Sequence, residues 1–297
     1  MKRFKNILYI LDGKTLVQQG SADKVATLAR LNDAHVTTLI ADETSLFDDL
    51  SLKISGKYAE IKQAIILQNN KDLEHFMSHD RWREIDISGD QDESFSFISI
   101  IQKVLRDSHD LVIMEETLDQ GIDQLAMRLV RKCPCPVWVI KRDSGDFRRI
   151  LAAINVGADY AEAKTLNQKI VELTHSLAQR EGGEAHYLHV WRLEHELTLR
   201  GPRFNVSSEE ITEMKSAIHE ERVAQLHSLL DQNHIPRQSD NVHIKEGRSE
   251  DVIRQVIGKL DVDVVVMGSV GRSGVPGLLI GNKAEKILST INCTVLT

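Results

Sequence analysis

One glycine-rich stretch near the C-terminus combines residue types that suit the binding of an anion. It runs from Met267 to Lys283 and reads MGSVGRSGVPGLLIGNK, directly after the apolar run VDVVVM. Gly268 and Gly271 allow a tight turn and a close approach to a ligand, because neither carries a Cβ. Asn282 is expected to cap a helix over residues 283–290, whose first amides then face outward. Outward amides at the positive end of a helix favour phosphate.

Two cations, Arg272 and Lys283, add positive charge to this stretch,. The alternative is a glycine-rich surface loop without a ligand, but a strand, glycines, a cap and cations in one register favour the anion site. The motif GxxxxGK[ST] does not occur, since no Ser or Thr follows Lys283, and GxGxxG is also missing,. The sequence therefore predicts neither a P-loop nor a dinucleotide site.

The spacing Gly268-x2-Gly271-x9-Gly281 resembles the nucleotide loop of the universal stress protein family. Family members usually carry Ser or Thr after the last glycine, whereas this chain has an asparagine that can cap and hydrogen-bond but lacks a hydroxyl. The resemblance implies ATP as the ligand and leaves Mg²⁺ open. It implies that the phosphates contact Gly268, Gly271, Gly281 and Asn282 with help from Arg272 and Lys283, and that the nucleoside borders Asn155, the main chain of Val190, and Met267.

Internal repeats indicate which elements position these residues. Three pairs of segments match: KNILYILD at 5–12 with RRILAAIN at 148–155, DLVIMEE at 110–116 with DVVVMGS at 263–269, and CPVWVI at 135–140 with CTVLT at 293–297. Strand patterns alternate with helical ones in each copy, which is typical of a doubly wound α/β unit. We predict two tandem domains, 1–143 and 144–297, each a mostly parallel five-stranded sheet with helices on both faces. The family resemblance covers essentially the whole chain and is closest to its tandem-domain members.

Local signals place the elements of the second copy. Strands are predicted near 149–154, 186–191, 241–245, 262–267 and 293–297, and the charged tract at 142–149 is predicted as the domain linker,. Ser207 and Glu210 form a capping-box pair that begins a long helix. We expect Ile211, Met214 and Ile218 to form its apolar face.

The two copies differ at the site itself. Glu115 and Glu116 stand where the second copy has Gly268 and Ser269, and the loop that follows is five residues shorter. Carboxylates would repel a polyphosphate, so we expect the first copy to have lost the phosphate loop. We interpret the two glutamates as a solvated strand exit rather than a catalytic pair. Asn155 is either a nucleoside contact or a turn former, and both interpretations stay open.

Composition and missing motifs exclude several functions. With 37 basic and 44 acidic residues the net charge is −7, and no basic block occurs, so nucleic acid is not an expected partner,. No apolar run is long enough to cross a membrane, and the N-terminus does not resemble a signal peptide, so we expect a cytoplasmic protein without membrane insertion,. The three cysteines form no metal quartet, His75 and His79 have no third ligand, and Cys135 and Cys293 are predicted to pack in the interior. We nominate no catalytic residue.

The family resemblance thus implies a stress-response protein whose second domain binds ATP as a sensor state. Two alternatives stay open: a non-catalytic scaffold for another anionic or amphiphilic metabolite or a protein partner, which Asn155 and Asn282 favour, and a weak ATPase. We expect the two domains to pair as an intramolecular pseudo-dimer through their last strands. A further homodimer of whole chains is left open.

Overall fold

The structure, a computed structural model, describes residues 3–11, 21–41, 58–90, 96–116, 121–141, 144–237, 240–268 and 282–297. Within these ranges it does not describe the side chains of residues 58, 59, 61, 62, 282 and 283. The chain divides into two compact units, and the boundary along the chain falls between Ser144 and Gly145.

Each unit contains five described parallel strands in an equivalent order. The first unit has the order β3-β2-β1-β4-β5, and its strands are β1 (Asn6–Leu11), β2 (His35–Ile40), β3 (Ile87–Gly89), β4 (Leu111–Glu116) and β5 (Val137–Lys141). The second has the order β8-β7-β6-β9-β10, with β6 (Arg149–Ile154), β7 (Glu184–Trp191), β8 (Val242–Glu246), β9 (Val264–Met267) and β10 (Thr294–Leu296). The predicted fold class, two tandem doubly wound α/β domains, is confirmed.

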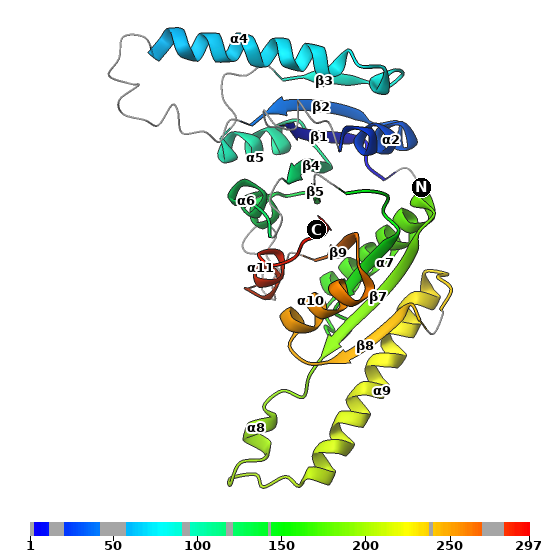
Figure 1. Cartoon of the computed structure of the whole chain (residues 1–297). Helices are drawn as coiled ribbons and strands as arrows, with labels where there is room; N and C mark the ends of the chain where they lie inside the picture. The colour runs from blue at the N-terminus through cyan, green and yellow to red at the C-terminus, as the bar shows by residue number, and fades with distance from the viewer. Residues whose placement is uncertain are drawn as a thin grey trace. The chain divides into compact units, whose positions relative to one another are not determined.

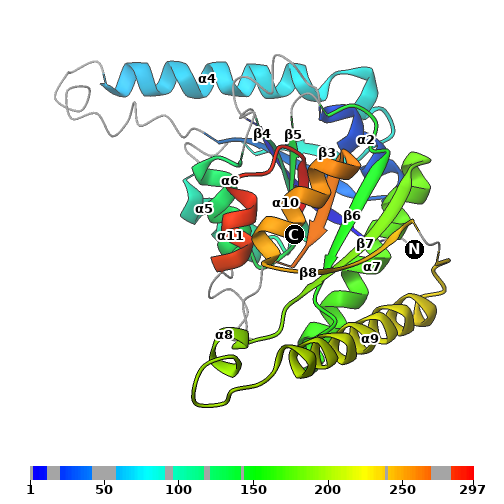
Figure 2. The ribbon, with the colours of Figure 1, turned by 60° about the horizontal axis from the view of Figure 1, so that its bottom comes forward.

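Helices connect the strands and cover both faces of each sheet (Figures 1 and 2). In the first unit these are α2 (Ala22–Asn32), α4 (Tyr58–Met77), the 3₁₀ turn η2 (Asp80–Trp82), α5 (Phe97–Arg106) and α6 (Gln124–Lys132). In the second they are α7 (Ala161–Glu181), α8 (Glu196–Leu199), α9 (Ser208–Gln232), α10 (Ser249–Leu260) and α11 (Asn282–Leu288). In the second unit α7 and α9 lie on one face of the sheet and α10 and α11 on the other, as right-handed crossovers require,.

The central strands are almost wholly buried, which explains their continuous apolar sequences. Val264 and Val265 are fully buried in β9, and Leu111, Val112 and Ile113 are fully buried in β4. The predicted strand over 262–267 begins two residues late, at Val264. Directly before the strand, the Asp263 carboxylate accepts the backbone N–H groups of Arg148 and Arg149, each at 2.8 Å.

The first unit contains the same device. Asp110 accepts the backbone N–H of Lys5 at 2.6 Å and that of Asn6 at 3.1 Å. In both units, therefore, an aspartate just before the fourth strand ties down the beginning of the first strand. This contact gives a physical reason for the aspartate at the start of the repeated segments DLVIMEE and DVVVMGS.

The helix predicted to begin at Ser207 has its capping box in place. The Ser207 hydroxyl accepts the N–H of Glu210 at 3.1 Å, and the Glu210 carboxylate accepts the N–H of Ser207 at 2.8 Å. The predicted apolar face is wrong in part, because Met214 is 40% exposed and Ile218 is half-buried. The buried positions of α9 are Ile211, Leu226 and Leu230.

The predicted linker at 142–149 also needs correction. Phe147 within it is fully buried, and Arg149 is already the first residue of β6. The charged composition of the tract therefore concealed a core side chain.

Candidate functional site

The carboxyl ends of β6, β7 and β9 lie side by side at one edge of the second sheet. From β6 the chain moves outward to β7 and β8, and then returns to β9 on the opposite side of β6. In doubly wound sheets ligands bind at this point of reversal, outside the carboxyl ends of the strands. Ala153 pairs with Met267 and Ile154 pairs with His189, so Asn155, Val190 and Gly268 come next at the same edge.

The Asn155 backbone is held by a second asparagine. Its N–H donates to Oδ1 of Asn167 at 3.2 Å, and its carbonyl accepts from Nδ2 of Asn167 at 2.9 Å. Asn167 comes from α7 and is only 7% exposed, whereas Asn155 is exposed. This reciprocal pair fixes the strand exit and leaves the Asn155 side chain facing solvent. The sequence did not predict this role of Asn167, because a single polar residue within a helix does not indicate which backbone groups it contacts.

His189 holds the last residue of β6 from the neighbouring strand. Its Nδ1 lies 3.0 Å from the carbonyl oxygen of Ile154, and the ring is 2% exposed. Burial lowers the pKa of His189, the hydrogen bond to Ile154 opposes this, and the charge of Arg222 lowers it further. The neutral ring is therefore favoured, with Nδ1–H donating to the carbonyl. Val190, the predicted main-chain contact, is the half-buried next residue of β7.

Met267 and Gly268 mark the end of β9. Met267 is 5% exposed and is the last residue of the strand. A Cβ added to Gly268 would lie 2.7 Å from Cδ2 of Leu166 and 3.8 Å from Cδ1 of Ile170. A side chain at this position would therefore require the end of the Leu166 side chain on α7 to shift.

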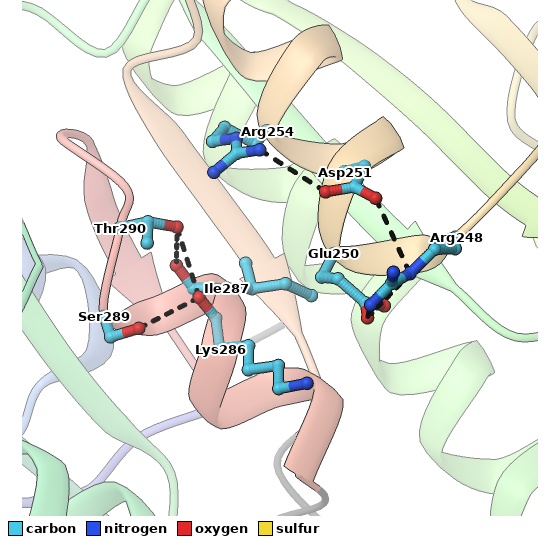
Figure 3. A network of polar contacts seen from close by, with 8 residues as sticks. All are labelled: Arg248, Glu250, Asp251, Arg254, Lys286, Ile287, Ser289 and Thr290. Carbon is cyan, nitrogen blue, oxygen red and sulfur yellow. Dashed lines mark hydrogen bonds and ion pairs between the residues drawn. The ribbon is translucent and has the colours of Figure 1, made fainter.

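The rest of the predicted phosphate loop lies largely outside the described residues. Gly271, Arg272 and Gly281 are not described, and the same holds for the side chains of Asn282 and Lys283. The predicted cap is shifted by one residue, since Asn282 is the first residue of α11. The helix also ends at Leu288 rather than at Thr290, and the Ser289 and Thr290 hydroxyls donate to the carbonyls of Lys286 and Ile287 (Figure 3).

Helix α11 packs against α10, which fixes the place where the loop ends. Ile287 and Leu288 are buried on this helix, and Figure 3 shows Lys286 extending toward Glu250 at the start of α10. The pKa of Glu250 is lowered chiefly by its hydrogen bond with Arg248, and the charge of Lys286 adds to this. The charge of Lys286, in the last turn of α11, therefore acts on a carboxylate at the beginning of α10.

The first unit presents a different surface at the same topological point. Ile10 pairs with Met114, so Glu115 is the next residue beside the end of β1. It is 4% exposed, and its Oε2 accepts the backbone N–H of Ser21 at 3.0 Å and the hydroxyl of Ser21 at 2.6 Å. The Ser21 hydroxyl also lies 2.6 Å from the hydroxyl of Tyr9. The carboxylate occupies the beginning of α2.

The side chain of Glu116 lies in the same way at the beginning of α6, the helix that precedes β5. It is 1% exposed and accepts the backbone N–H of Asp123 at 2.5 Å, while Asp123 accepts the N–H of Ala126 at 2.7 Å. Lys141 donates to the carbonyl of Gly121 nearby. The interpretation of Glu115 and Glu116 as a solvated strand exit is therefore wrong. Strand β4 continues through both residues, and backbone amides compensate their burial,.

The described residues contain no group of three or more His, Cys, Asp or Glu side chains placed to hold a metal ion. Among the described helices, none has the length and apolar character needed to span a bilayer.

Fold and strand-edge geometry together define a tandem α/β protein with doubly wound units, whose second unit carries a glycine-rich loop after its fourth strand. Residues 146–297 match the sequence profile of the universal stress protein family. This match covers more than half of the chain, and the chain belongs to that family. Membership supports a role in the response to stress.

Several relatives extend the comparison over the first unit. The universal stress protein E homolog of Haemophilus influenzae is 26% identical over 308 positions, which cover 99% of this chain and 97% of that protein. Universal stress protein E of Escherichia coli K12 is 27% identical over 208 positions, 67% of this chain and 64% of that protein. A crystal structure of a universal stress protein from Pseudomonas aeruginosa superposes with a TM-score of 0.70 at 19% identity, covering 99% of this chain and 93% of that one.

Proposed function

We propose that the second unit binds ATP and that the bound and free forms are two states of a cytoplasmic stress-response regulator. The observation that supports this most directly is the strand edge at β6 and β9. There Asn155 and Gly268 directly follow the ends of β6 and β9, and Val190 is the second-to-last residue of β7, at the point where the order of the strands along the chain reverses. The glycine-rich loop leaves from this same edge, and α11 begins where the loop ends.

Each residue of the proposed site has a role that its chemistry allows. Asn155, Val190 and Met267 border the nucleoside, and Asn155 offers both donors and an acceptor from a backbone that Asn167 immobilises,. Backbone amides at Gly268, Gly271, Gly281 and Asn282 bind the phosphates, and Arg272 and Lys283 neutralise charge. These roles call for binding and orientation, and no described residue of the edge is assigned a proton-transfer step.

The key test replaces the last glycine of the loop. Gly281→Val adds a branched side chain where the phosphates approach the backbone, and we expect the ATP affinity to fall at least about tenfold, through the loss of close amide contacts. Isothermal titration with and without Mg²⁺ measures this. A matched control is Gly258→Ala on α10, because a Cβ there meets nothing within 4 Å. Equal ATP affinity of a folded Gly281→Val variant and the control would refute the assignment.

A second measurement identifies the ligand without assuming it. Denaturing freshly purified protein releases any bound small molecule for mass spectrometry. ATP or its hydrolysis products would support the proposal. A different anionic metabolite would favour the scaffold alternative, for which the exposed Asn155 offers a hydrogen-bonding group.

A further inference from the structure

Two cysteines in the first unit lie close together between α6 and β5. The sulfur atoms of Cys133 and Cys135 are 3.5 Å apart. Cys133 is the residue that ends α6, and its backbone N–H donates to the carbonyl of Leu129 at 2.8 Å. The sequence analysis assigned Cys135 to interior packing, yet this residue is half-buried beside a second thiol.

The backbone around the pair is held in place by two prolines. Pro134 fixes its own φ, and each proline restricts the preceding cysteine to extended conformations. Cys133 has φ −66° and ψ 132°, in accordance with this restriction. The carbonyl of Pro136 accepts the N–H of Val112 in β4 at 3.0 Å. One end of the segment is thus anchored to α6 and the other to the sheet. The backbone between the two cysteines therefore has few conformations, and the sulfur atoms stay close together.

The pair differs from the third cysteine in exposure and in its electrostatics. Cys133 and Cys135 are half-buried, whereas Cys293 is 5% exposed. The hydrogen bond from the Cys135 thiol lowers the pKa of Cys133, and burial opposes this. The same contact raises the pKa of Cys135, as burial does. Cys133 is therefore the sulfur that ionises first, and Cys135 keeps its proton beside it.

We propose that Cys133 and Cys135 form a reversible oxidation site for hydroperoxides, which closes to an intrachain disulfide. The Cys133 thiolate attacks the peroxide oxygen, the O–O bond breaks, and water or an alcohol leaves after protonation. The Cys133 sulfenic acid is then attacked by the Cys135 sulfur, so that the S–O bond breaks and hydroxide leaves with the Cys135 proton as water. Two thiols and one hydrogen peroxide become one disulfide and two water molecules.

The geometry makes closure easy and the product reducible. Disulfide formation brings the sulfur atoms from 3.5 Å to about 2.05 Å, so the two atoms start close to bonding distance,. The closed ring contains one intervening residue, so it removes little chain entropy and adds little stability. Half-exposed bonds of this kind are labile to thiols and are suited to a switch rather than a structural link. This inference concerns the first unit and is independent of nucleotide binding by the second.

The test uses the full chain and hydrogen peroxide. Tryptic cleavage after Lys132 and Lys141 isolates CPCPVWVIK, which contains both cysteines. After brief peroxide treatment and alkylation, we expect this peptide to have lost two hydrogens, to resist alkylation, and to recover both thiols with reduced glutathione. Its oxidation should be about tenfold or more faster than that of the buried Cys293. A peptide that stays fully alkylatable, or that gains oxygen without losing hydrogens, would overturn the proposal.

Two variants separate the roles of the sulfurs. Cys135→Ser should stop the loss of hydrogens and leave added oxygen on Cys133, because the second thiol is missing. Cys293→Ser is the matched control and should leave the oxidation of the peptide unchanged. Disulfide formation between chains in the wild-type protein, shown by non-reducing electrophoresis in place of the intrachain link, would also count against the assignment.

Discussion

The buried Asn167 illustrates how one residue can hold the exit of a strand. It makes two hydrogen bonds with the backbone of Asn155 while 7% exposed. We predict that Asn167→Ala lowers the free energy of unfolding by about 1 to 3 kcal/mol, because two hydrogen bonds to the part-buried backbone of Asn155 are lost,. Urea denaturation measures the change, and Gln168→Ala on the exposed side of α7 is the control. Equal stability of both variants would show that the pair contributes nothing.

A second residue-scale prediction concerns pH. Burial lowers the pKa of His243 to about 4, and the charges of His186, Lys245 and Lys259 act in the same direction, while Asp240 opposes them. An unfolded chain binds this proton near its ordinary pKa of about 6.5, before the folded chain does. Stability is therefore full above pH 6.5, falls as the pH drops from 6.5 to 4, and levels off below that.

The expected loss is about 1 to 2 kcal/mol over this range, since His243 is half-buried and solvent screens part of the shift. Urea unfolding of the wild type and of His243→Asn at pH 7 and pH 4 measures this loss. It is the amount by which the free energy of unfolding falls more in the wild type than in the variant between the two pH values. His195→Asn, at an exposed histidine with φ 59°, is the control because asparagine tolerates that conformation,. Parallel pH profiles for wild type and His243→Asn would contradict the prediction.

Residue types alone could not predict the polar contacts at the carboxyl ends of the central strands. The motif around Gly268 was visible because its spacing is local. By contrast, Glu115 finds its partner Ser21 ninety-four positions away, and His189 finds Ile154 thirty-five positions away. Two adjacent carboxylates at a strand end are usually solvated, and only the tertiary structure shows the amides that bury these two.

At the scale of elements, the repeated aspartate before the fourth strand gives a direct test of the tandem architecture. Asp263 accepts two backbone N–H groups at the start of β6, and Asp110 does the same for β1. We predict that Asp263→Ala lowers stability by about 1 to 3 kcal/mol and speeds hydrogen exchange at the start of β6, because charge-assisted bonds are lost. Asp263→Asn keeps an acceptor oxygen and should lose less.

Hydrogen exchange followed by mass spectrometry distinguishes this from a global effect. The matched variant Asp110→Ala should speed exchange at Lys5 and Asn6 in the first unit. Each variant should affect its own unit first, since the hydrogen bonds that it removes lie within that unit. Uniform acceleration over both units would argue against the local explanation.

Elements were predictable where a pattern repeats along the chain. The fold class followed from the alternation of strands and helices and from matched segments such as KNILYILD and RRILAAIN. The apolar face of α9 was predicted less well. Ile211, Met214 and Ile218 share a helical stripe, but the core covers only Ile211 fully, and Leu226 and Leu230 carry the burial further along. Periodicity identifies the stripe and cannot say how much of a 25-residue helix meets the sheet.

The two units share one fold but differ in the residues at the carboxyl ends of their central strands. In the second unit the edge ends in Gly268 and an exposed Asn155. In the first, Glu115 and Glu116 are buried there, and their carboxylates accept amides at the beginnings of α2 and α6. Backbone amides at helix beginnings are groups that an anion can bind, so in the first unit an anionic ligand would have to compete with the chain's own carboxylates for them,.

This asymmetry predicts that the full chain binds one ATP. Two equivalent sites would require a polyphosphate to displace Glu115 and Glu116, or to lie against their charges, and both are unfavourable. Equilibrium dialysis with labelled ATP at saturation should give a stoichiometry near one, and Gly281→Val should reduce it toward zero. Glu115→Gln removes a charge without touching the second unit and should leave one site. A stoichiometry of two for the wild type, or binding that survives Gly281→Val and is strengthened in Glu115→Gln, would place a nucleotide in the first unit.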